Sequence, residues 1–365
     1  MPKKVIVAMS GGLDSSVAAA ILKRAGFEVT GVFMKLANLL SFKEAGKRAR
    51  KIAKILGIPF LVLDLRKEFK KRIIDYFLKE YKRGVTPNPC VICNKEIKFG
   101  LLLEKTLDLD ADFVATGHYT RLKKDKNGIH LLKARDKDKD QSYFLWMLNQ
   151  NQLKRILFPI ENYTRKEVEN LARKFKLPVL NIKKSVEICF IQTTINDFLK
   201  KYLKPKPGQI VDVRGKVLGK HRGLHFYTIG QRKGIGLPGG PAFAKASAGK
   251  PYYVLDKNLK KNLLIVTKNE RNLYKKELIA KNVNWISGKV PEFPLKLKAK
   301  IRYRHQSALA VITKTLNPKT YTLKFEKSQR AITPGQSVVF YLPRSSPKAM
   351  VWGKGEELLG GGIIC

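Results

Sequence analysis

The stretch VIVAMSGGLDSSVAAAILKRAG, residues 5–26, decides the fold of this chain. Residues 5–9 are apolar and predict a buried strand, and residues 15–26 predict a helix that ends at Gly26. Two glycines between them let the chain turn so that several backbone N–H groups point at one place, at the positive end of the helix dipole. The order strand, glycine loop, helix therefore predicts a phosphate-binding loop. It has neither the Gly-Lys-Ser/Thr ending of a Walker A loop nor the pattern G-x-G-x-x-G.

The segments that follow alternate between strand and helix. Apolar runs predict strands over 28–34, 59–65 and 112–116, and amphipathic runs predict helices over 41–57, 68–82 and 89–106. Such a series predicts an α/β fold with a parallel, doubly wound sheet. Ligands bind such sheets outside the carboxyl ends of the strands, so residues 9–12, Met34 and residues 116–118 are expected to line the site.

The pattern changes after about residue 204. Up to there QSYFLWML (141–148), TRKEVENLARKF (164–175) with a capping box from Thr164 to Glu167, and NDFLKKYL (196–203) predict further helix. Beyond the linker KPKPG, short alternating strands and glycine turns predict small β-barrels. We expect three domains, over residues 1–204, 205–288 and 289–365, the second with a mobile loop at 241–250 that carries no chemistry.

Composition narrows the partners and the compartment. The formal net charge of +44, from 73 Lys and Arg against 29 Asp and Glu, suits a polyanionic partner, although a general lysine bias would also produce it. Four cysteines in 365 residues do not make a secreted disulfide framework. The N-terminal apolar run meets two glycines before it could serve as a signal peptide or membrane span. We expect a cytoplasmic protein without membrane contact.

The pair Cys90-x-x-Cys93 is the chemically most suggestive spacing, open to metal binding or to thiol chemistry. Cys93 is expected in the first turns of a helix that begins either with Asn88 as cap and Pro89 at its first position or with Asn94 as cap. The helix N-terminus, with Lys95 and Lys98 nearby, should lower the pKa of its thiol. A buried, inert helical cysteine is the alternative.

Two further cysteines are more distant in sequence. Cys189 lies between Ile188 and Phe190 and could be a core cysteine in a strand. Cys365 is expected to be a bystander. In the glycine loop, Ser10, Ser15 and Ser16 can add hydroxyl donors, and Asp14 can cap the helix or approach a magnesium ion.

The glycine loop and several later motifs resemble those of known protein families. The loop SGGLDSS resembles that of the PP-loop ATP pyrophosphatases, which split ATP to AMP and pyrophosphate. Together with the blocks behind it, the chain resembles the tRNA-specific 2-thiouridylase family from residue 3 to the closing LGGGII. Those blocks, in order, are TPNPCVICNKEIKFG, ATGHYTRL, KDKDQSYFL, ICFI, YTIGQRKGIG, RYR and TPGQSVVFY. The resemblance implies a PP-loop (adenine nucleotide alpha hydrolase-like) domain followed by two small β-rich or β-barrel domains.

The resemblance also implies roles for residues. Members of the family adenylate the 2-carbonyl of the wobble uridine with ATP and Mg²⁺ and then replace its oxygen with sulfur. Cys189 matches the cysteine that receives sulfur as a persulfide from a desulfurase or relay protein, and Cys93 matches its partner thiol. The ATP-binding positions would be Ala8, Met9, Ser10, Gly11, Gly12, Leu13, Asp14, Ser15, Met34 and Gly117. The tRNA-contacting positions would be Asn88, Pro89, Cys90, His118, Lys139, Asp140, Gln141, Arg302, Tyr303 and Gln336.

One departure from the family pattern keeps alternatives open. Some members have aspartate where this chain has Cys90, and that aspartate is a candidate acid or base. Cys90, Cys93 and Cys189 form a two-plus-one set that in other RNA-thiolating PP-loop enzymes holds an iron–sulfur cluster. The persulfide reading needs no protein-bound metal at these thiols.

Two rival functions are an amide-forming PP-loop ligase and a tRNA-binding module with a vestigial ATP site. Taken singly, the RNA positions also have structural readings: His118 could cap a strand end, and residues 135–140 could be a solvated turn.

Overall fold

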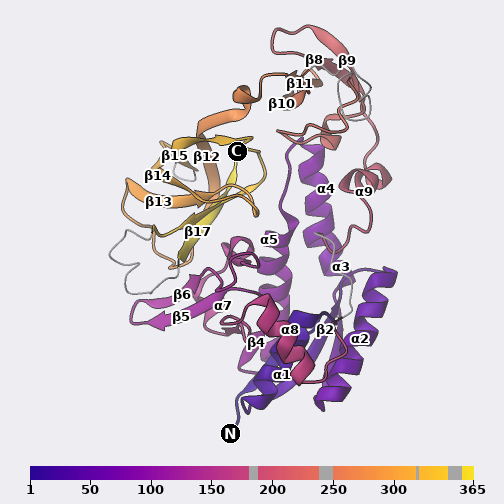
Figure 1. The fold of residues 1–365 in the computed structure, drawn as a ribbon, viewed down its shortest axis with the longest axis vertical. Coiled ribbons are helices and arrows are strands. Elements are labelled where there is room, and N and C mark those ends of the chain that lie inside the picture. The colour runs from indigo at the N-terminus through magenta and orange to yellow at the C-terminus, as the bar shows by residue number, and fades with distance from the viewer. Residues whose placement is uncertain (181–187, 238–249, 318–319, 344–355) are drawn as a thin grey trace.

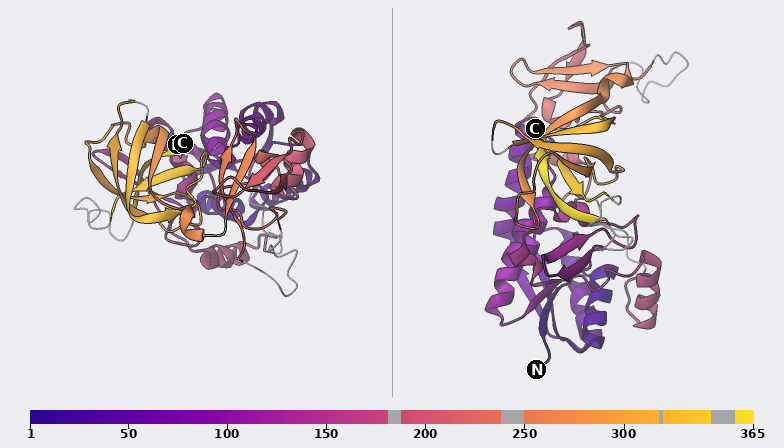
Figure 2. Two further views of the ribbon diagram at one scale, coloured as in Figure 1. Left: turned by 90° about the horizontal axis from the view of Figure 1, so that it is seen from above. Right: turned by 90° about the vertical axis from the view of Figure 1, so that its left-hand side faces the viewer.

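The computed structural model describes residues 1–180, 188–237, 250–317, 320–343 and 356–365. Figures 1 and 2 show three parts arranged along the long axis. An α/β part with the N-terminus lies at one end, a small β-sheet lies at the other, and a β-barrel lies beside the helices that run between them. The predicted fold class is confirmed.

The α/β part is built on a five-stranded sheet in which every pairing is parallel, with the order β3-β2-β1-β4-β7. Its strands are β1 (Lys4–Ala8), β2 (Glu28–Lys35), β3 (Phe60–Asp64), β4 (Phe113–Ala115) and β7 (Ile156–Leu157). In register, Val7 lies opposite Gly31 on one side and Ala115 on the other. The carboxyl ends of β1, β2 and β4 therefore lie together at one edge of the sheet, as predicted.

Alternate residues of the central strand face opposite layers of helices. Val5 and Val7 pack in a core cluster with residues of α1 (Leu13–Arg24), α2 (Leu40–Leu56) and α8 (Arg165–Lys174). Ile6 and Ala8 pack in a second cluster on the other face. The predicted capping box of α8 is present, because the side chains of Thr164 and Glu167 each accept a hydrogen bond from the other's backbone N–H.

Two long helices rise from the sheet towards the β domains (Figure 1), and the second of them packs Phe99 and Leu102 against the second face. Each is continuous but has a π-helical middle. The first consists of α3 (Arg66–Phe69), η1 (Lys70–Ile74) and α4 (Asp75–Lys82), and the second of α5 (Pro89–Cys93), η2 (Asn94–Leu101) and α6 (Leu102–Asp108). Asn88 is the N-cap of α5 and Pro89 its first residue, the first of the two predicted starts. The second π segment begins directly after Cys93, and such segments occur frequently at functional sites.

The segment after β4 contains a hairpin for which no element was predicted, and less helix than predicted over residues 141–148. It forms a hairpin of β5 (Arg121–Asp125) and β6 (Gly128–Leu132), and QSYFLWML contains only the short 3₁₀ helix η3 (Ser142–Leu145), followed by α7 (Gln150–Leu153). Its apolar residues are buried because they pack against the barrel. The indole Nε1 of Trp146 donates to Ser337 Oγ at 3.0 Å, and a Cβ on Gly361 would lie 2.8 Å from that ring.

The central β part is a four-stranded sheet with the order β10-β11-β8-β9. Its strands are β8 (Gly208–Val211), β9 (Val217–His221), β10 (Tyr253–Asn258) and β11 (Leu263–Thr267); α9 (Ile195–Tyr202) precedes them and η4 (Leu224–Phe226) lies between β9 and β10. Residues 227–237, expected to include a strand, have none. Of the expected loop at 241–250, all but Lys250 lies outside the described residues.

The C-terminal β part is a closed six-stranded antiparallel barrel. Its strands are β12 (Tyr274–Trp285), β13 (Leu295–Lys300), β14 (Ala308–Lys314), β15 (Thr320–Arg330), β16 (Ser337–Tyr341) and β17 (Glu357–Ile364), with η6 (Glu270–Leu273) before them. Pairing of β12 with β17 closes the barrel, and β17 also pairs with β6 of the hairpin. Strand β12 lies ahead of the expected boundary at 288 and pairs with strands beyond it. In the described part of the chain, no helix has the length and apolarity to cross a membrane.

Candidate active site

The glycine loop after β1 has the geometry of a phosphate cradle. Gly11 has φ of 72°, and a Cβ there would lie 2.3 Å from the Ala45 carbonyl oxygen, so only glycine fits against α2. Gly12 is the N-cap of α1 and supplies no side chain to cap it. The first N–H groups of α1 are therefore available to an anion at the positive end of the helix dipole. The residues present fit a nucleotide phosphate.

The loop serines do not all take the predicted role. Ser10 is exposed, and its hydroxyl lies 3.2 Å from that of Ser15. The hydroxyls of Ser15 and Ser16 donate to the Gly12 carbonyl at 3.2 and 2.7 Å. Ser15 and Ser16 thus hold the shape of the loop, and Ser10 has the hydroxyl that faces solvent.

The remaining residues expected at the nucleotide surround this loop. Ala8, Met9 and Leu13 are buried beneath it, and Met34 is half-buried at the end of β2. A Cβ on Gly117 would lie 2.6 Å from both the Asp14 carbonyl carbon and the Ser15 nitrogen. The backbone after β4 therefore packs directly on the first turn of α1, which brings the three strand ends into one site.

Asp14 is bonded to the protein rather than free to bind a cation. Its Oδ1 accepts from the Tyr119 hydroxyl at 2.8 Å and from Arg165 Nη1 at 3.0 Å, and Oδ2 lies 3.2 Å from the same nitrogen. Burial raises the pKa of the Asp14 carboxyl, and the Arg165 charge opposes this rise. Sequence reasoning missed both partners: Tyr119 directly follows His118 in a motif already singled out, whereas Arg165 carried no signal.

The structure brings three of the four cysteines together. Cys93 is buried at the end of α5, in the same core cluster as Phe190 and Ile191. The next residue back from Phe190 is Cys189, which is exposed in a turn and not in a strand. Negative charge on Cys189 or Cys90 would raise the pKa of Cys93, so these thiols lie within electrostatic range of it. Cys365 lies apart from them, directly after β17 in the barrel.

The prediction that the pKa of Cys93 is lowered is wrong. Burial raises the pKa of its thiol from 9.0 to about 12, and the nearby Lys98 charge only partly opposes this. The helix N-terminus cannot compensate, because α5 buries the sulfur in an apolar cluster. Cys189 is exposed as a residue, yet the protein around its sulfur raises its pKa to about 11. Both cysteines are therefore thiols at neutral pH until the site is rearranged or loaded.

The raised pKa predicts how Cys93 reacts with a thiol reagent. In the folded protein its alkylation rate should still rise tenfold per pH unit at pH 10, whereas in urea it should level off near the ordinary pKa of 9.0. Mass spectrometry of iodoacetamide-treated protein, with exposed Cys365 as internal reference, would measure both profiles. A native profile that levels off below pH 9 would show that the thiol is activated after all.

His118 connects the cysteine helix to the sheet edge. It is buried, with Nδ1 at 2.7 Å from Thr116 Oγ1 and Nε2 at 3.5 Å from Lys98 Nζ. Burial, reinforced by the Lys98 charge, holds the pKa of this imidazole well below its ordinary value, so the ring is neutral. Because the ammonium can only donate, Nε2 accepts and Nδ1–H donates to Thr116. Strand-end anchoring is thus what the structure shows for His118.

The loop at 139–141 is hydrogen-bonded to Ala134 and to Tyr119, which lies beside the glycine loop. Asp140 is buried and accepts from the backbone N–H groups of Ala134 and Ser142 at 3.0 and 3.2 Å. Gln141 pairs with the backbone of Tyr119 through its side chain, at 3.0 Å, and its N–H, at 2.9 Å. Lys139 is half-buried, and its charge lowers the pKa of Asp14. The side chains of Asp140 and Gln141 thus bond to the protein, whereas no hydrogen bond is seen from the Lys139 ammonium to the described residues.

The arm that leads to Asn88, Pro89 and Cys90 is gripped by the barrel. Gln336 Nε2 donates to the Thr86 carbonyl at 2.9 Å. Thr86 N–H in turn donates to the Pro334 carbonyl at 2.9 Å. The structure therefore joins Gln336 to the 88–90 segment, with its amide nitrogen bound to protein.

The two remaining barrel residues face inward. Arg302 Nη2 donates to the Ala331 carbonyl at 2.7 Å and to Thr333 Oγ1 at 2.6 Å. The Tyr303 ring lies 4.4 Å from that of Phe144, between centroids. Tyr303 thus joins the barrel to η3, whereas Arg302 bonds within the barrel.

The described residues contain no group of three His, Cys, Asp or Glu side chains arranged to hold a metal ion. Cys90, Cys93 and Cys189 are near one another but do not form such a group. The arrangement gives the iron–sulfur alternative no support.

A glycine phosphate loop on a parallel sheet, with thiols beside the sheet edge and two β domains attached, defines a PP-loop nucleotide-binding enzyme. Three domain families match in order: a "tRNA methyl transferase HUP domain" over residues 3–193, a "tRNA methyl transferase PRC-barrel domain" over 196–268 and an "Aminomethyltransferase beta-barrel domain" over 275–364. The chain belongs to the tRNA-specific 2-thiouridylase family.

Similar proteins carry that name in several bacteria. The tRNA-specific 2-thiouridylase MnmA of Syntrophomonas wolfei is 43% identical over 363 residues, covering 99% of this chain and 99% of its own. That of Halothermothrix orenii is 43% identical over 379 residues, with 99% and 98% covered. That of Clostridioides difficile is 43% identical over 378 residues, with 100% and 98% covered.

Proposed function

We propose that this chain is an ATP-dependent tRNA sulfurtransferase that replaces the 2-oxygen of the wobble uridine with sulfur. The observation that carries the proposal is the shared location of two reactive parts. The glycine loop lies at the carboxyl edge of the sheet, and the helix that bears Cys93 reaches the same edge through Lys98 and His118. Cys189 lies within electrostatic range of Cys90. The names of the similar proteins support the same activity.

The first step activates the base. The uridine 2-carbonyl is a poor electrophile, so its oxygen attacks the α-phosphorus of ATP and pyrophosphate leaves. The uncapped N–H groups of α1 and the Ser10 hydroxyl would stabilise the phosphate charge. Mg²⁺, bound by phosphates, would supply further charge neutralisation. Since Asp14 is engaged by Arg165 and Tyr119, its contribution is to hold α1 and α8 around the loop.

The second step transfers sulfur. A donor first leaves a persulfide on Cys189, and its terminal sulfur attacks C2 of the uridine and displaces AMP. The product is held to Cys189 by a sulfur–sulfur bond. The Cys93 thiolate then attacks Cys189 Sγ, which releases the thiocarbonyl and forms a Cys93–Cys189 disulfide. A thiol reductant must restore both cysteines. The raised pKa of Cys93 requires that its proton leave in the loaded site, and the nearby Lys98 ammonium would stabilise the thiolate.

The proposal includes two groups of residues expected to contact tRNA. One group would contact the RNA directly, and the other would position the protein for it. Asn88, Pro89 and Cys90 lie at the N-terminal end of α5, the helix that ends with Cys93, and would contact the target base. Half-buried Lys139 would contact a phosphate. For Arg302, Tyr303 and Gln336, whose printed contacts are within the protein, we propose that they orient the barrel and the 88–90 arm towards RNA.

One assay tests the function against its rivals. Purified protein with ATP, Mg²⁺, a persulfide donor, a thiol reductant and unmodified tRNA should form AMP and 2-thiouridine, detected by nucleoside mass spectrometry. Omitting tRNA should abolish AMP formation. AMP formation that needs an amine and ignores tRNA would indicate an amide-forming ligase. Binding of tRNA without AMP would indicate a binding module. A methyl group in place of sulfur would support the transferase named in the domain descriptions.

A further inference from the structure

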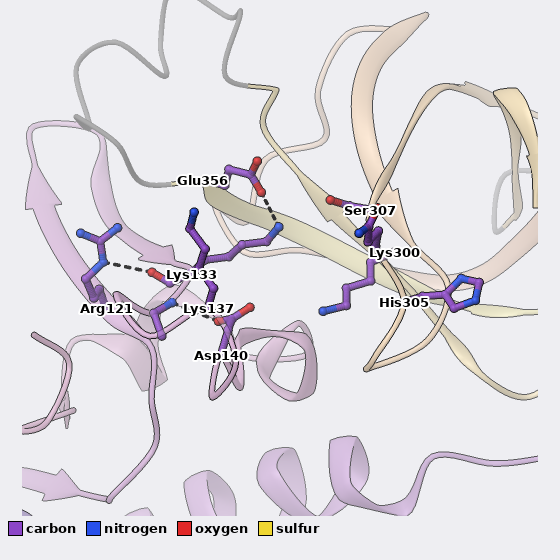
Figure 3. Close-up of a pocket in the computed structure, with 10 residues that line it drawn as sticks. Arg121, Lys133, Lys137, Asp140, Lys300, His305, Ser307 and Glu356 are labelled. Atoms are coloured by element: carbon purple, nitrogen blue, oxygen red, sulfur yellow. Dashed lines mark hydrogen bonds and ion pairs between the residues drawn. The ribbon is translucent and has the colours of Figure 1, made fainter. Parts of the chain in front are cut away.

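A basic cavity lies between the hairpin and the barrel, next to the site described so far, and Asp140 belongs to both. Its volume is about 350 Å³. Figure 3 shows that Arg121, Lys133 and Lys137 reach it from the hairpin and the loop that follows, whereas Lys300 reaches it from the barrel on the opposite side. The cavity therefore exists only where the two domains meet.

The cavity has more positive than negative charge. Four cationic side chains line it against two carboxylates, Asp140 and Glu356. Glu356 is shared between Lys133 and Lys298. Asp140 uses its oxygens on the N–H groups of Ala134 and Ser142 and on the Ser142 hydroxyl. Both carboxylates are therefore already engaged in hydrogen bonds or ion pairs, and they act on Lys300 only through their charge.

Lys300 is the cation that most requires a partner. It is half-buried, and within the described ranges it forms no ion pair. Its nitrogen lies 5.6 Å from the centroid of the Tyr303 ring, and burial lowers its pKa. Arg121 donates from Nε to the Lys133 carbonyl at 3.0 Å, and no hydrogen bond is seen from its two terminal nitrogens to the described residues. Partly desolvated cations that form no direct ion pair are stabilised by a bound anion.

The wall of the cavity is continuous with the nucleotide site. The loop that contributes Lys137 and Asp140 continues into Gln141, which pairs with the Tyr119 backbone, and the Tyr119 hydroxyl bonds Asp14 beside the glycine loop. An anion held here would lie next to the adenylating site. It would also join the barrel to the α/β domain by contacting both.

We propose that this cavity binds a backbone phosphate of the tRNA and so fixes the anticodon arm against both domains. The proposal rests on the proposed function, since it assumes that tRNA is the substrate. Phosphate oxygens suit a fork of one guanidinium and two or three ammonium groups. The net charge of +44 makes a nucleic acid the favoured source of that phosphate over a free anion.

Lys300→Met tests the proposal, because methionine is an unbranched side chain of similar length and removes the charge. Binding of unmodified tRNA should weaken about tenfold. The slope of log affinity against log salt should become shallower by about 0.7–0.9, the value for one lost phosphate contact. Lys324→Met is the matched control, as Lys324 is exposed on β15 with Glu277 at 3.6 Å and lies outside the cavity. Its slope should not change.

The alternatives give different results. Equal slopes for wild type and Lys300→Met, or equal losses in both variants, would overturn the cavity as a phosphate site. If inorganic phosphate at constant ionic strength protects the wild type but not Lys300→Met against heat, while the tRNA slopes agree, the site takes a free anion and the RNA assignment is overturned. Thiolation by the wild type is measured separately, so an inactive wild type with a changed slope would refute the function and leave the RNA site standing.

Discussion

Replacing Cys189 with serine is expected to reduce formation of 2-thiouridine by about a thousandfold or more, because the residue proposed to carry the sulfur has lost its nucleophile. The glycine loop proposed to bind ATP lies elsewhere, directly before α1, and is not touched by this change. ATP–pyrophosphate exchange in the presence of tRNA should therefore be retained. The two measurements together separate sulfur transfer from activation of the base.

Cys93→Ser and Cys365→Ser sharpen this result. With Cys93 replaced, Cys189 should remain joined to the tRNA through a disulfide, visible as a covalent protein–RNA species that a thiol reductant releases, since the thiol that resolves it is gone. Cys365, exposed after β17, should be replaceable without effect. Full thiolation by Cys189→Ser would refute the assigned role of this residue. If thiolation by Cys189→Ser is then lost when Cys90 is also replaced by serine, Cys90 is the sulfur carrier.

Gly117→Ala is expected to have the second largest effect. The added methyl group would lie 2.6 Å from backbone atoms of Asp14 and Ser15, which cannot move without shifting the start of α1. Crowding of this kind typically costs about 1–3 kcal/mol of folding stability. A displacement of the loop by about 1 Å can reduce catalysis about a hundredfold. AMP formation should fall accordingly, while tRNA binding is less affected.

Gly26→Ala is the control for stability. Gly26 follows the far end of α1, with φ of 83° and no atom within 4 Å of an added Cβ. Alanine there should cost about 1 kcal/mol through backbone strain and leave AMP formation unchanged. If Gly26→Ala lowers AMP formation as much as Gly117→Ala does, the loss reflects general destabilisation and not the contact with the loop.

The sheet and its glycine loop could be predicted from sequence because each depends on local pattern. Apolar runs of strand length, helical periodicity and paired glycines all lie within residues 5–26 and their repeats. The hairpin was missed even though Asn127 and Gly128, a frequent turn pair, lie between residues that alternate in polarity. Its outer edge is satisfied by β17, a partner 227 positions away when counted from His130 to Glu357.

The chemistry of the site was harder to predict than its composition. Position in a helix suggested an acidic Cys93, but burial among apolar side chains has the larger effect, and burial is set by tertiary packing. Gln336 and Arg302 looked like surface contacts in sequence and instead bind backbone carbonyls of the protein. Lys300 carried no signal, because its partners in the cavity come from a hairpin in another domain.

The dependence of β6 on β17 also bears on how the molecule assembles. During synthesis the hairpin is complete long before its neighbour is made, so β6 presents an open row of N–H and C=O groups in the interval. Contacts of such long sequence separation form slowly. The hairpin edge of a half-made chain is thus open to pairing with another copy until β17 has been made.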